Sequence, residues 1–137
     1  MMNETKLRYV YKHKRDGDWQ YDYFTLDEIE SGKAAEMVRA IKRDGYELIA
    51  RDRFIGVGDK NGVEVYEGDH IVCKQYIGGN WVDNVIEKGT VSFKDGAFYL
   101  LRKQGYYRPL AWLIEMDYAL EVIGNIHEGK GDAGRND

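Results

Sequence analysis

The chain has 137 residues, sixteen glycines against one proline, a single cysteine and a formal net charge of −4. Its length suits one domain with a sizeable core. The lone Cys73 allows neither an intrachain disulfide nor a Cys-x-x-Cys metal site, and the acidic balance lacks the basic footprint of a protein that binds duplex DNA. No signal peptide or membrane-spanning run is recognisable in the sequence, so we expect a cytoplasmic protein without a membrane partner.

The chain should begin with a β-hairpin followed by a helix. Leu7–Lys12 and Trp19–Phe24 are rich in β-forming residues and flank Asp16-Gly17, a combination that predicts a hairpin. Thr25-Leu26-Asp27-Glu28 has the pattern of a capping box, which marks the start of a helix. Gly32 should end or bend that helix.

An apolar stripe at helical spacing predicts a second helix over Lys33–Arg43. The stripe consists of Ala34, Met37, Val38 and Ile41. Lys42 and Arg43 suit the negative end of a helix dipole, and Gly45 should close the helix.

From residue 46 onward, short β-rich runs alternate with glycine turns. The predicted strands are Tyr46–Val57, Ile71–Tyr76, Trp81–Ile86, Thr90–Phe93, Ala97–Leu100 and Leu120–Ile126. The predicted structural turns are Asn61-Gly62, Gly68-Asp69 and Asp95-Gly96. A short helical turn should begin at Pro109 and run to Met116.

Closely spaced short strands are typical of a small barrel or sandwich. We therefore predict a mainly β, α+β protein in which a hairpin and a helical segment (residues 1–45) precede an SH3-like small β-barrel (residues 46–128). Residues 129–137 are polar and glycine-rich, and we expect them to be disordered.

Three segments of the second half resemble a known family. DKNGVEVYEGDHIV (59–72), GTVSFKDGAFYL (89–100) and LEVIGNIHE (120–128) are similar, in this order, to the three signature blocks of the YopX family of bacteriophage and prophage proteins. The resemblance covers about residues 54–128 and is weakest over the first 45. After the last block the chain has Gly129-Lys130-Gly131-Asp132, where family members often have Asn-Pro-Glu-Leu.

This resemblance implies a mostly β, SH3-type fold, carried on mobile genetic elements and made in the cytoplasm of a bacterial host cell. It supplies no enzymatic activity, no catalytic residue and no cofactor, because none is established for the family.

The most reactive-looking cluster is Glu67-Gly68-Asp69-His70, which could be imagined as a metal site or an acid–base set. Two carboxylates around a glycine usually accept hydrogen bonds from turn amides. Asp69 and His70 are neighbours, so their side chains should point to opposite faces of a strand. We favour a structural role and keep a hydrolase that uses the Glu67/Asp69 corner as a distant alternative.

The remaining candidate groups do not indicate an enzyme. His13 and His127 belong to no metal or catalytic pattern, and Cys73 lies in an apolar run without a base. Gly56-Val57-Gly58 lacks the third glycine and the helix of a dinucleotide fingerprint. We expect no enzymatic activity, no metal ion and no cofactor.

Two clusters interleave basic and aromatic residues, as proteins that grip single-stranded nucleic acid do. The first contains Lys12, Lys14, Arg15, Trp19 and Tyr21, and the second contains Arg102, Tyr106, Tyr107 and Arg108. In the alternative interpretation the aromatic side chains form the hairpin core and cross-strand pairs, or face another protein.

The leading hypothesis is a non-enzymatic phage or prophage accessory protein that binds another protein, phage or host, and associates with itself through the hairpin. Self-association would cover exposed strand edges. The runner-up is a β-barrel that binds single-stranded nucleic acid.

Overall fold

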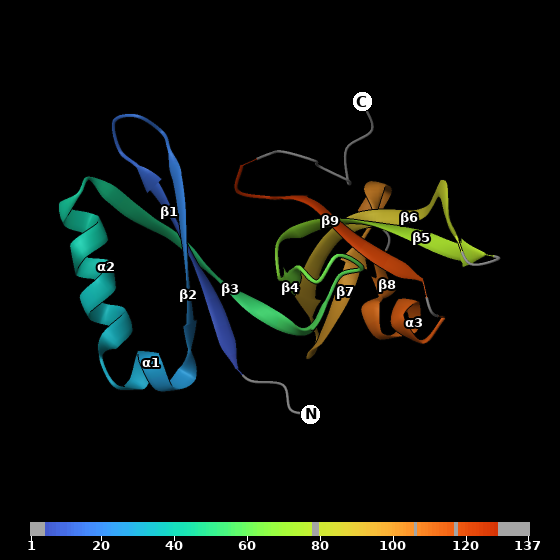
Figure 1. The fold of residues 1–137 in the computed structure, drawn as a ribbon, viewed down its shortest axis with the longest axis horizontal. Helices are drawn as coiled ribbons and strands as arrows, with labels where there is room; N and C mark the ends of the chain where they lie inside the picture. The colour runs from blue at the N-terminus through green and yellow to red at the C-terminus, as the bar shows by residue number, and fades with distance from the viewer. Residues whose placement is uncertain (1–4, 78–79, 106, 117, 129–137) are drawn as a thin grey trace. The chain divides into compact units, whose positions relative to one another are not determined.

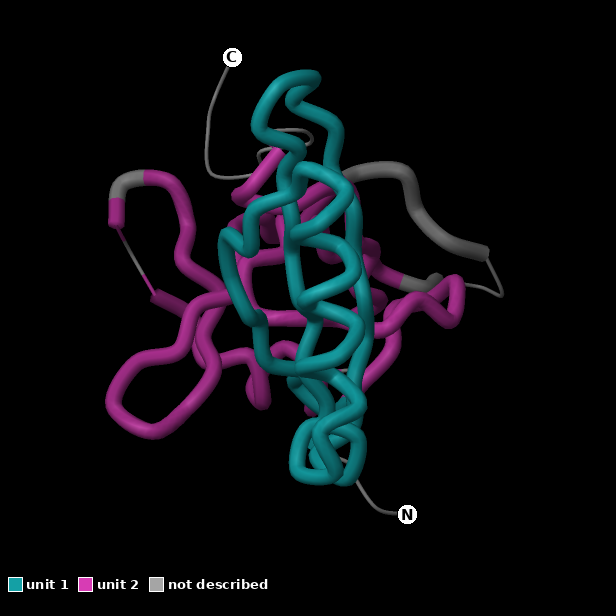
Figure 2. Tube along the Cα trace, turned by 90° about the vertical axis from the view of Figure 1, so that its left-hand side faces the viewer, with its two compact units in different colours: residues 1–56 teal, residues 57–137 magenta. Residues whose placement is uncertain are grey.

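The computed structural model describes residues 5–77, 80–105, 107–116 and 118–128. The chain divides into two compact units, residues 1–56 and 57–137 (Figure 2). We predicted a boundary near residue 45. It falls after Gly56 because the strand that starts at Tyr46 pairs along residues 46–53 with the first strand of the chain. The tail predicted for residues 129–137 lies outside the described residues.

Unit 1 contains three strands of a four-stranded antiparallel sheet and two helices. Its elements are β1 (Lys6–His13), β2 (Trp19–Thr25), α1 (Leu26–Glu30), α2 (Lys33–Arg43) and most of β3 (Tyr46–Gly58). β1 lies between β2 and β3 and is antiparallel to both. The predicted hairpin and both predicted helices are confirmed.

The capping box at the start of α1 forms as the sequence predicts. The Thr25 hydroxyl accepts the Glu28 N–H at 3.3 Å, and the Glu28 carboxylate accepts the Thr25 N–H at 2.9 Å. Gly32, with φ of +89°, separates α1 from α2. The two helices lie on one face of the sheet (Figure 1). The buried core between the helices and the sheet consists of Tyr9, Tyr11, Phe24 and Ala34.

A β-bulge explains why the polar–apolar alternation of β3 is imperfect. The register between β1 and β3 shifts between the pairs Val10↔Ala50 and Tyr11↔Leu48. Leu48 therefore packs against the helix-side core, whereas Ala50 and Asp52 pair with β1 residues on the other face.

Unit 2 is dominated by a five-stranded antiparallel sheet. Its elements are β4 (Glu64–Tyr66), β5 (Asp69–Ile77), β6 (Asn80–Lys94), β7 (Ala97–Leu101), η1 (Lys103–Gly105), β8 (Tyr107–Pro109), α3 (Leu110–Glu115) and β9 (Ala119–Asn125). The strand order is β8-β7-β6-β5-β9, and the three-residue β4 is the last member of the other sheet, next to β3. Buried side chains include those of Ile71, Cys73, Val91, Leu100 and Leu113.

The mainly β prediction is confirmed, and the fold consists of two antiparallel sheets. No closed barrel is detected in the described part of the chain. The two strands predicted at residues 81–86 and 90–93 form one long strand, β6, which continues through Gly89 without a turn. A Cβ at Gly89 would clash with the Leu101 carbonyl, so this glycine allows a close approach between β6 and β7 instead of a turn. Within the described ranges, no helix has the length and apolar character needed to cross a membrane.

Candidate binding surfaces

The Gly68-Asp69 corner is held together by backbone hydrogen bonds. The buried Asp69 carboxylate accepts the Tyr66 N–H at 2.8 Å, and the Gly68 N–H bonds the Val91 carbonyl at 2.9 Å. His70 points to Thr90, with 2.7 Å between Nδ1 and the hydroxyl oxygen. Nowhere among the described residues do three His, Cys, Asp or Glu side chains gather as metal ligands would.

Asp59 organises the Asn61-Gly62 turn and ties it to the last strand. Its Oδ1 accepts the N–H groups of Asn61 (2.8 Å) and Val63 (2.9 Å), and its Oδ2 accepts the Val122 N–H at 3.0 Å. The first two bonds belong to a local turn motif that Asp favours. The third joins residues 63 positions apart, and sequence reasoning missed it because nothing local signals it.

The other two turns are also built by local geometry. Asp95 and Gly96 both have positive φ (53° and 82°), as a two-residue type I′ hairpin requires. Near the end of the chain, the Asn125 side-chain oxygen accepts the N–H groups of His127 (2.9 Å) and Glu128 (3.1 Å). Each segment that resembles the YopX family thus contains backbone-shaping residues.

The first basic–aromatic cluster is divided between two places in unit 1. Lys12 and Trp19 are direct cross-strand partners, and the Lys12 ammonium lies 5.1 Å from the Trp19 ring centroid. Tyr21 is covered in the same way by Arg8, at 5.7 Å. These side chains share the sheet face opposite the helices, because β1 residues alternate and Tyr9 and Tyr11 face the helix side.

Lys14 and Arg15 lie instead at the tip of the hairpin, beside Arg43 and Asp44 in a shallow hollow. His13 fixes this tip. Its Nδ1 accepts the N–H groups of Arg15 and Asp16, both at 3.1 Å, so its ring proton sits on Nε2, 3.1 Å from the Asp44 carbonyl oxygen. No sequence pattern predicted this structural role of His13.

The second basic–aromatic cluster does not form one surface. Arg102 and Arg108 both turn toward Glu87, with the closest contacts at 2.9 and 3.1 Å. Arg108 also lies over Trp112, at 4.6 Å from the ring centroid. Glu87 therefore offsets the arginine charge that a phosphate would need, and sequence reasoning did not identify it.

Tyr107, from the same predicted cluster, belongs to a different group of side chains. Its ring packs edge-on against Tyr99 at 5.8 Å and lies under Lys94 at 4.3 Å. Tyr106 lies outside the described residues.

Cys73 is fully buried on β5. Burial, together with the negative charge of Glu87, raises the pKa of its thiol to about 12. A thiol with such a pKa stays protonated at neutral pH and is a poor nucleophile.

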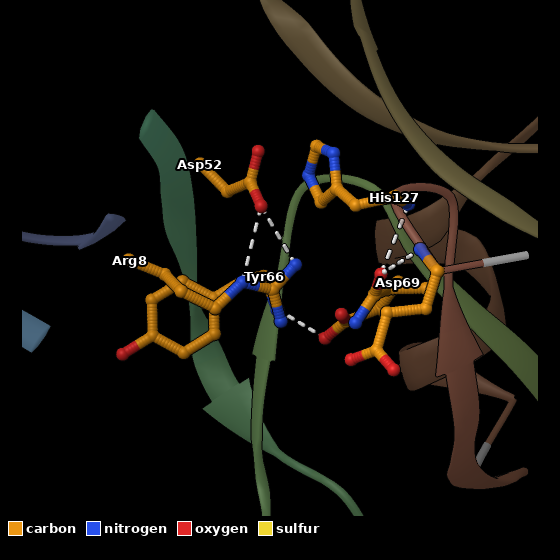
Figure 3. Close-up of polar contacts among 7 residues, drawn as sticks. Arg8, Asp52, Tyr66, Asp69 and His127 are labelled. Atoms are coloured by element: carbon orange, nitrogen blue, oxygen red, sulfur yellow. Dashed lines mark hydrogen bonds and ion pairs between the residues drawn. The ribbon is translucent and has the colours of Figure 1, made fainter. Parts of the chain in front are cut away.

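A buried ion pair crosses the sheet of unit 1 and was not predicted. Arg8 and Asp52 are cross-strand partners, and the Arg8 Nε and Nη2 donate to one carboxylate oxygen of Asp52 at 3.1 and 2.8 Å (Figure 3). Their side chains are only 6% and 9% exposed. A pairing between residues 44 positions apart leaves no local pattern in the sequence.

The edge strands of the two sheets differ in how well they are protected against pairing with a strand of another chain. β8 and β4 have three residues each, and β8 ends at Pro109. β9 is covered by the turn before β4, where the Lys60 N–H bonds the Leu120 carbonyl and Asp59 binds the Val122 N–H. Short strands, proline and covering loops are the usual ways to blunt an edge.

β2 carries none of these devices. It is the terminal strand of its sheet, it has seven residues, and its sequence WQYDYFT contains neither proline nor lysine. Trp19, Tyr21 and Tyr23 alternate along it, and the Tyr23 side chain is 52% exposed.

Comparison with known proteins gives one match. The family model described as YopX protein matches residues 1–130, which includes the N-terminal unit as well as the three segments of the second half. Neither a curated protein nor a solved structure matches the chain.

Proposed function

The chain belongs to the YopX family, and from that premise we propose that it is a non-enzymatic phage or prophage accessory protein that acts by binding protein chains, among them a second copy of itself, in the cytoplasm of a bacterial host. The observation that supports this proposal is the character of β2, a seven-residue terminal strand with an aromatic residue at every second position. A strand edge of this kind is a template for another strand.

The aromatic row adds to the affinity that such an edge offers. Tyr and Trp are enriched at protein interfaces because they provide large contact area with few rotatable bonds. Only one charged residue, Asp22, interrupts the strand, and it is half-buried on the helix-covered face, opposite Tyr9.

Light scattering coupled to size-exclusion chromatography, at tens of micromolar, tests self-association. We expect a mass above that of one protomer, and a shift toward one protomer in Tyr23→Lys, because an edge lysine opposes strand addition. Tyr107→Lys is the matched control in unit 2, where the tyrosine is also exposed (40%), and it should keep the mass of the wild type. A one-protomer mass for the wild-type chain would contradict the proposal.

Single-stranded nucleic acid is the second candidate ligand. Lys12 on Trp19 and Arg8 on Tyr21 combine a ring with a cation on one sheet face. Those ring faces are already covered by the protein's own cations, so a base would have to displace them. This candidate predicts binding of a labelled oligonucleotide that weakens steeply with salt. Lys12→Glu should reduce the binding if the oligonucleotide lies on this sheet face, and Lys14→Glu with Arg15→Glu should reduce it if it lies at the hairpin tip.

An SH3-like relationship of unit 2 belongs to the same proposal. It is supported by the strand order, in which β9 returns beside β5 so that the last strand neighbours the first strand of a four-strand meander. Such an order is compatible with a partly open small barrel.

A further inference from the structure

A groove runs along β3 on the side of unit 1 where α2 lies. Two shallow hollows meet at Arg51. One is lined by β3 from Tyr46 to Arg51 together with Lys14 and Lys42, and the other by Tyr9, Ile29 and the α2 face that carries Ala35, Val38 and Arg39. Ala35, Val38, Arg39 and Lys42 are spaced as one face of a helix. The groove thus has a helix as one wall and a strand as the other.

The β3 wall is a strand edge over these residues. β1 pairs with one side of β3 along residues 46–53. On the other side β4 has only three residues, and the Asp59 N–H bonds the Val63 carbonyl at the turn between them. A three-residue strand after this turn can reach only the last residues of β3. In the described ranges no strand occupies the rest of that side.

The backbone groups of this edge have a definite direction. The Lys14 N–H bonds the Gly45 carbonyl at 2.9 Å, and this bond flanks the register pair His13↔Tyr46, which is therefore a non-hydrogen-bonded pair. Hydrogen-bonded and non-bonded pairs alternate along an antiparallel ladder. The N–H and C=O groups of Tyr46 and Leu48 therefore point away from β1, toward the groove.

The side chains of the groove combine an apolar floor with positive charge. Tyr9, Ile29, Ala34 and Val38 supply the floor, and Lys14, Lys42, Arg39 and Arg51 stand around it. The described part of the chain holds no ion pair to any of these four cations, although Arg51 lies over the Tyr9 ring at 5.4 Å. Glu47 is the one acidic residue that lines the groove.

We propose that the groove between α2 and β3 binds an extended acidic segment of a partner protein, which adds to β3 as a further strand. Main-chain hydrogen bonds to Tyr46 and Leu48 provide the affinity, and alternate side chains enter the space between helix and strand. The positive rim selects glutamate and aspartate and rejects basic segments. This site uses β3, whereas self-association uses β2, so either can fail without the other.

The probe is a labelled, end-capped peptide of alternating glutamate and valine, titrated into the full chain while amide NMR signals are recorded. We expect shifts over Tyr46–Arg51 and the outer face of α2, and weaker binding at higher salt. N-methylation of the peptide at alternate positions, on the side that faces β3, should abolish binding because it removes the donors that strand addition needs.

Charge-reversal variants test the rim. Arg39 and Arg51 are exposed, so Arg39→Glu with Arg51→Glu should fold and should weaken peptide binding by about tenfold or more. Lys12→Glu makes the same kind of change on the opposite face of the sheet and should leave the peptide affinity unchanged.

The proposal is overturned if the peptide does not bind or if the Arg39/Arg51 variant binds it equally well. It is also overturned if the N-methylated peptide binds as well, if an oligonucleotide displaces it from the same residues with higher affinity, or if the chain's own self-association shifts those residues without peptide.

Discussion

The two units stabilise their sheets by different means, and they leave their edges in different states. In unit 2 the side chains of Asp59, Asp69 and Asn125 accept backbone N–H groups and close the turns, while the outer strands are short or covered. In unit 1 a buried ion pair, Arg8 with Asp52, joins the strands, and β2 and much of β3 remain long edges.

Under the proposed function, this difference assigns a structural role to unit 2 and binding to unit 1. The segments that identify the family most clearly lie in unit 2, and their polar residues are used in turns. The long edges lie in unit 1, beside aromatic and basic side chains. A protein that binds by strand addition needs an edge held rigid by the rest of its fold, and unit 1 has two such edges.

The largest effect we expect on stability comes from breaking the ion pair of unit 1. Asp52→Ala removes the carboxylate that takes two N–H groups of the buried Arg8, and loss of one partner of a buried pair costs about 3–5 kcal/mol. Urea unfolding gives the free energy, and amide hydrogen exchange should show that unit 1 loses the most protection.

Two controls sharpen this test. Asp18→Ala removes an exposed aspartate of the same unit and should change stability little. Arg8→Met with Asp52→Leu removes both charges and should recover most of the loss. A small loss in Asp52→Ala would mean that the pair contributes little to holding β1 and β3 together.

The next largest effect should come from the turn of unit 2. Asp59→Ala leaves three backbone N–H groups without their acceptor and should cost about 2 kcal/mol, with the greatest loss of amide protection at Val122 and along β9. Asp59→Asn keeps one carbonyl oxygen and should be intermediate. Unchanged protection of β9 in Asp59→Ala would show that the turn does not secure this edge.

Local patterns in the sequence predicted local structure well. The Thr25–Glu28 capping box, the α2 stripe, the Asp95-Gly96 hairpin and the extent of β3 all follow from spacing along the chain, and the structure confirms them. These features depend on contacts between residues a few positions apart, which the chain order alone determines.

Long-range partners could not be predicted in the same way. No local pattern links Asp52 to Arg8, because their pairing depends on a bulge that shifts the register by one residue. Sequence reasoning assigned Arg102 and Arg108 to a ligand and did not identify Glu87, the carboxylate that forms an ion pair with both of them. Whether a basic residue is available to a ligand depends on the acid that folding places beside it.

Alkaline pH should weaken unit 2 through Cys73. Its thiol has an ordinary pKa of 9.0 and a folded pKa of about 12, raised by burial and then by Glu87. A raised pKa means that the contribution to stability is complete below about pH 9 and is lost as pH rises toward 12. At pH 10 the loss should be about 1.4 kcal/mol, the equivalent of one pKa unit.

Cys73→Ala isolates this contribution. Tyr11 in unit 1 is also buried and its pKa is raised by burial and by Asp22, so the wild-type chain loses stability at high pH from both units. Unfolding free energies at pH 7 and pH 10 should differ less in Cys73→Ala than in the wild type. Equal differences in the two chains would show that ionisation of the Cys73 thiol does not lower the free energy of unfolding. Iodoacetamide should also react with the folded chain far more slowly than with the unfolded chain.

The smallest effect we expect lies at the start of α1, where unit 1 uses a side-chain cap. Thr25→Ala removes the hydroxyl that accepts the Glu28 N–H, and loss of such a cap costs about 0.5–1 kcal/mol. Thr25→Ser keeps the oxygen and should remain near the wild-type value in the same urea titration.

The cap also depends on pH, because the Thr25 N–H donated to Glu28 lowers the pKa of that carboxyl below 4.5. Its contribution is complete above pH 4.5 and is lost as pH falls through the lower folded value. Glu28→Ala removes this carboxylate, whereas Thr25→Ala keeps the backbone N–H that it binds. A Glu28→Ala chain should therefore differ less from the wild type in acid than at neutral pH, and a difference that grows in acid would argue against the reciprocal cap.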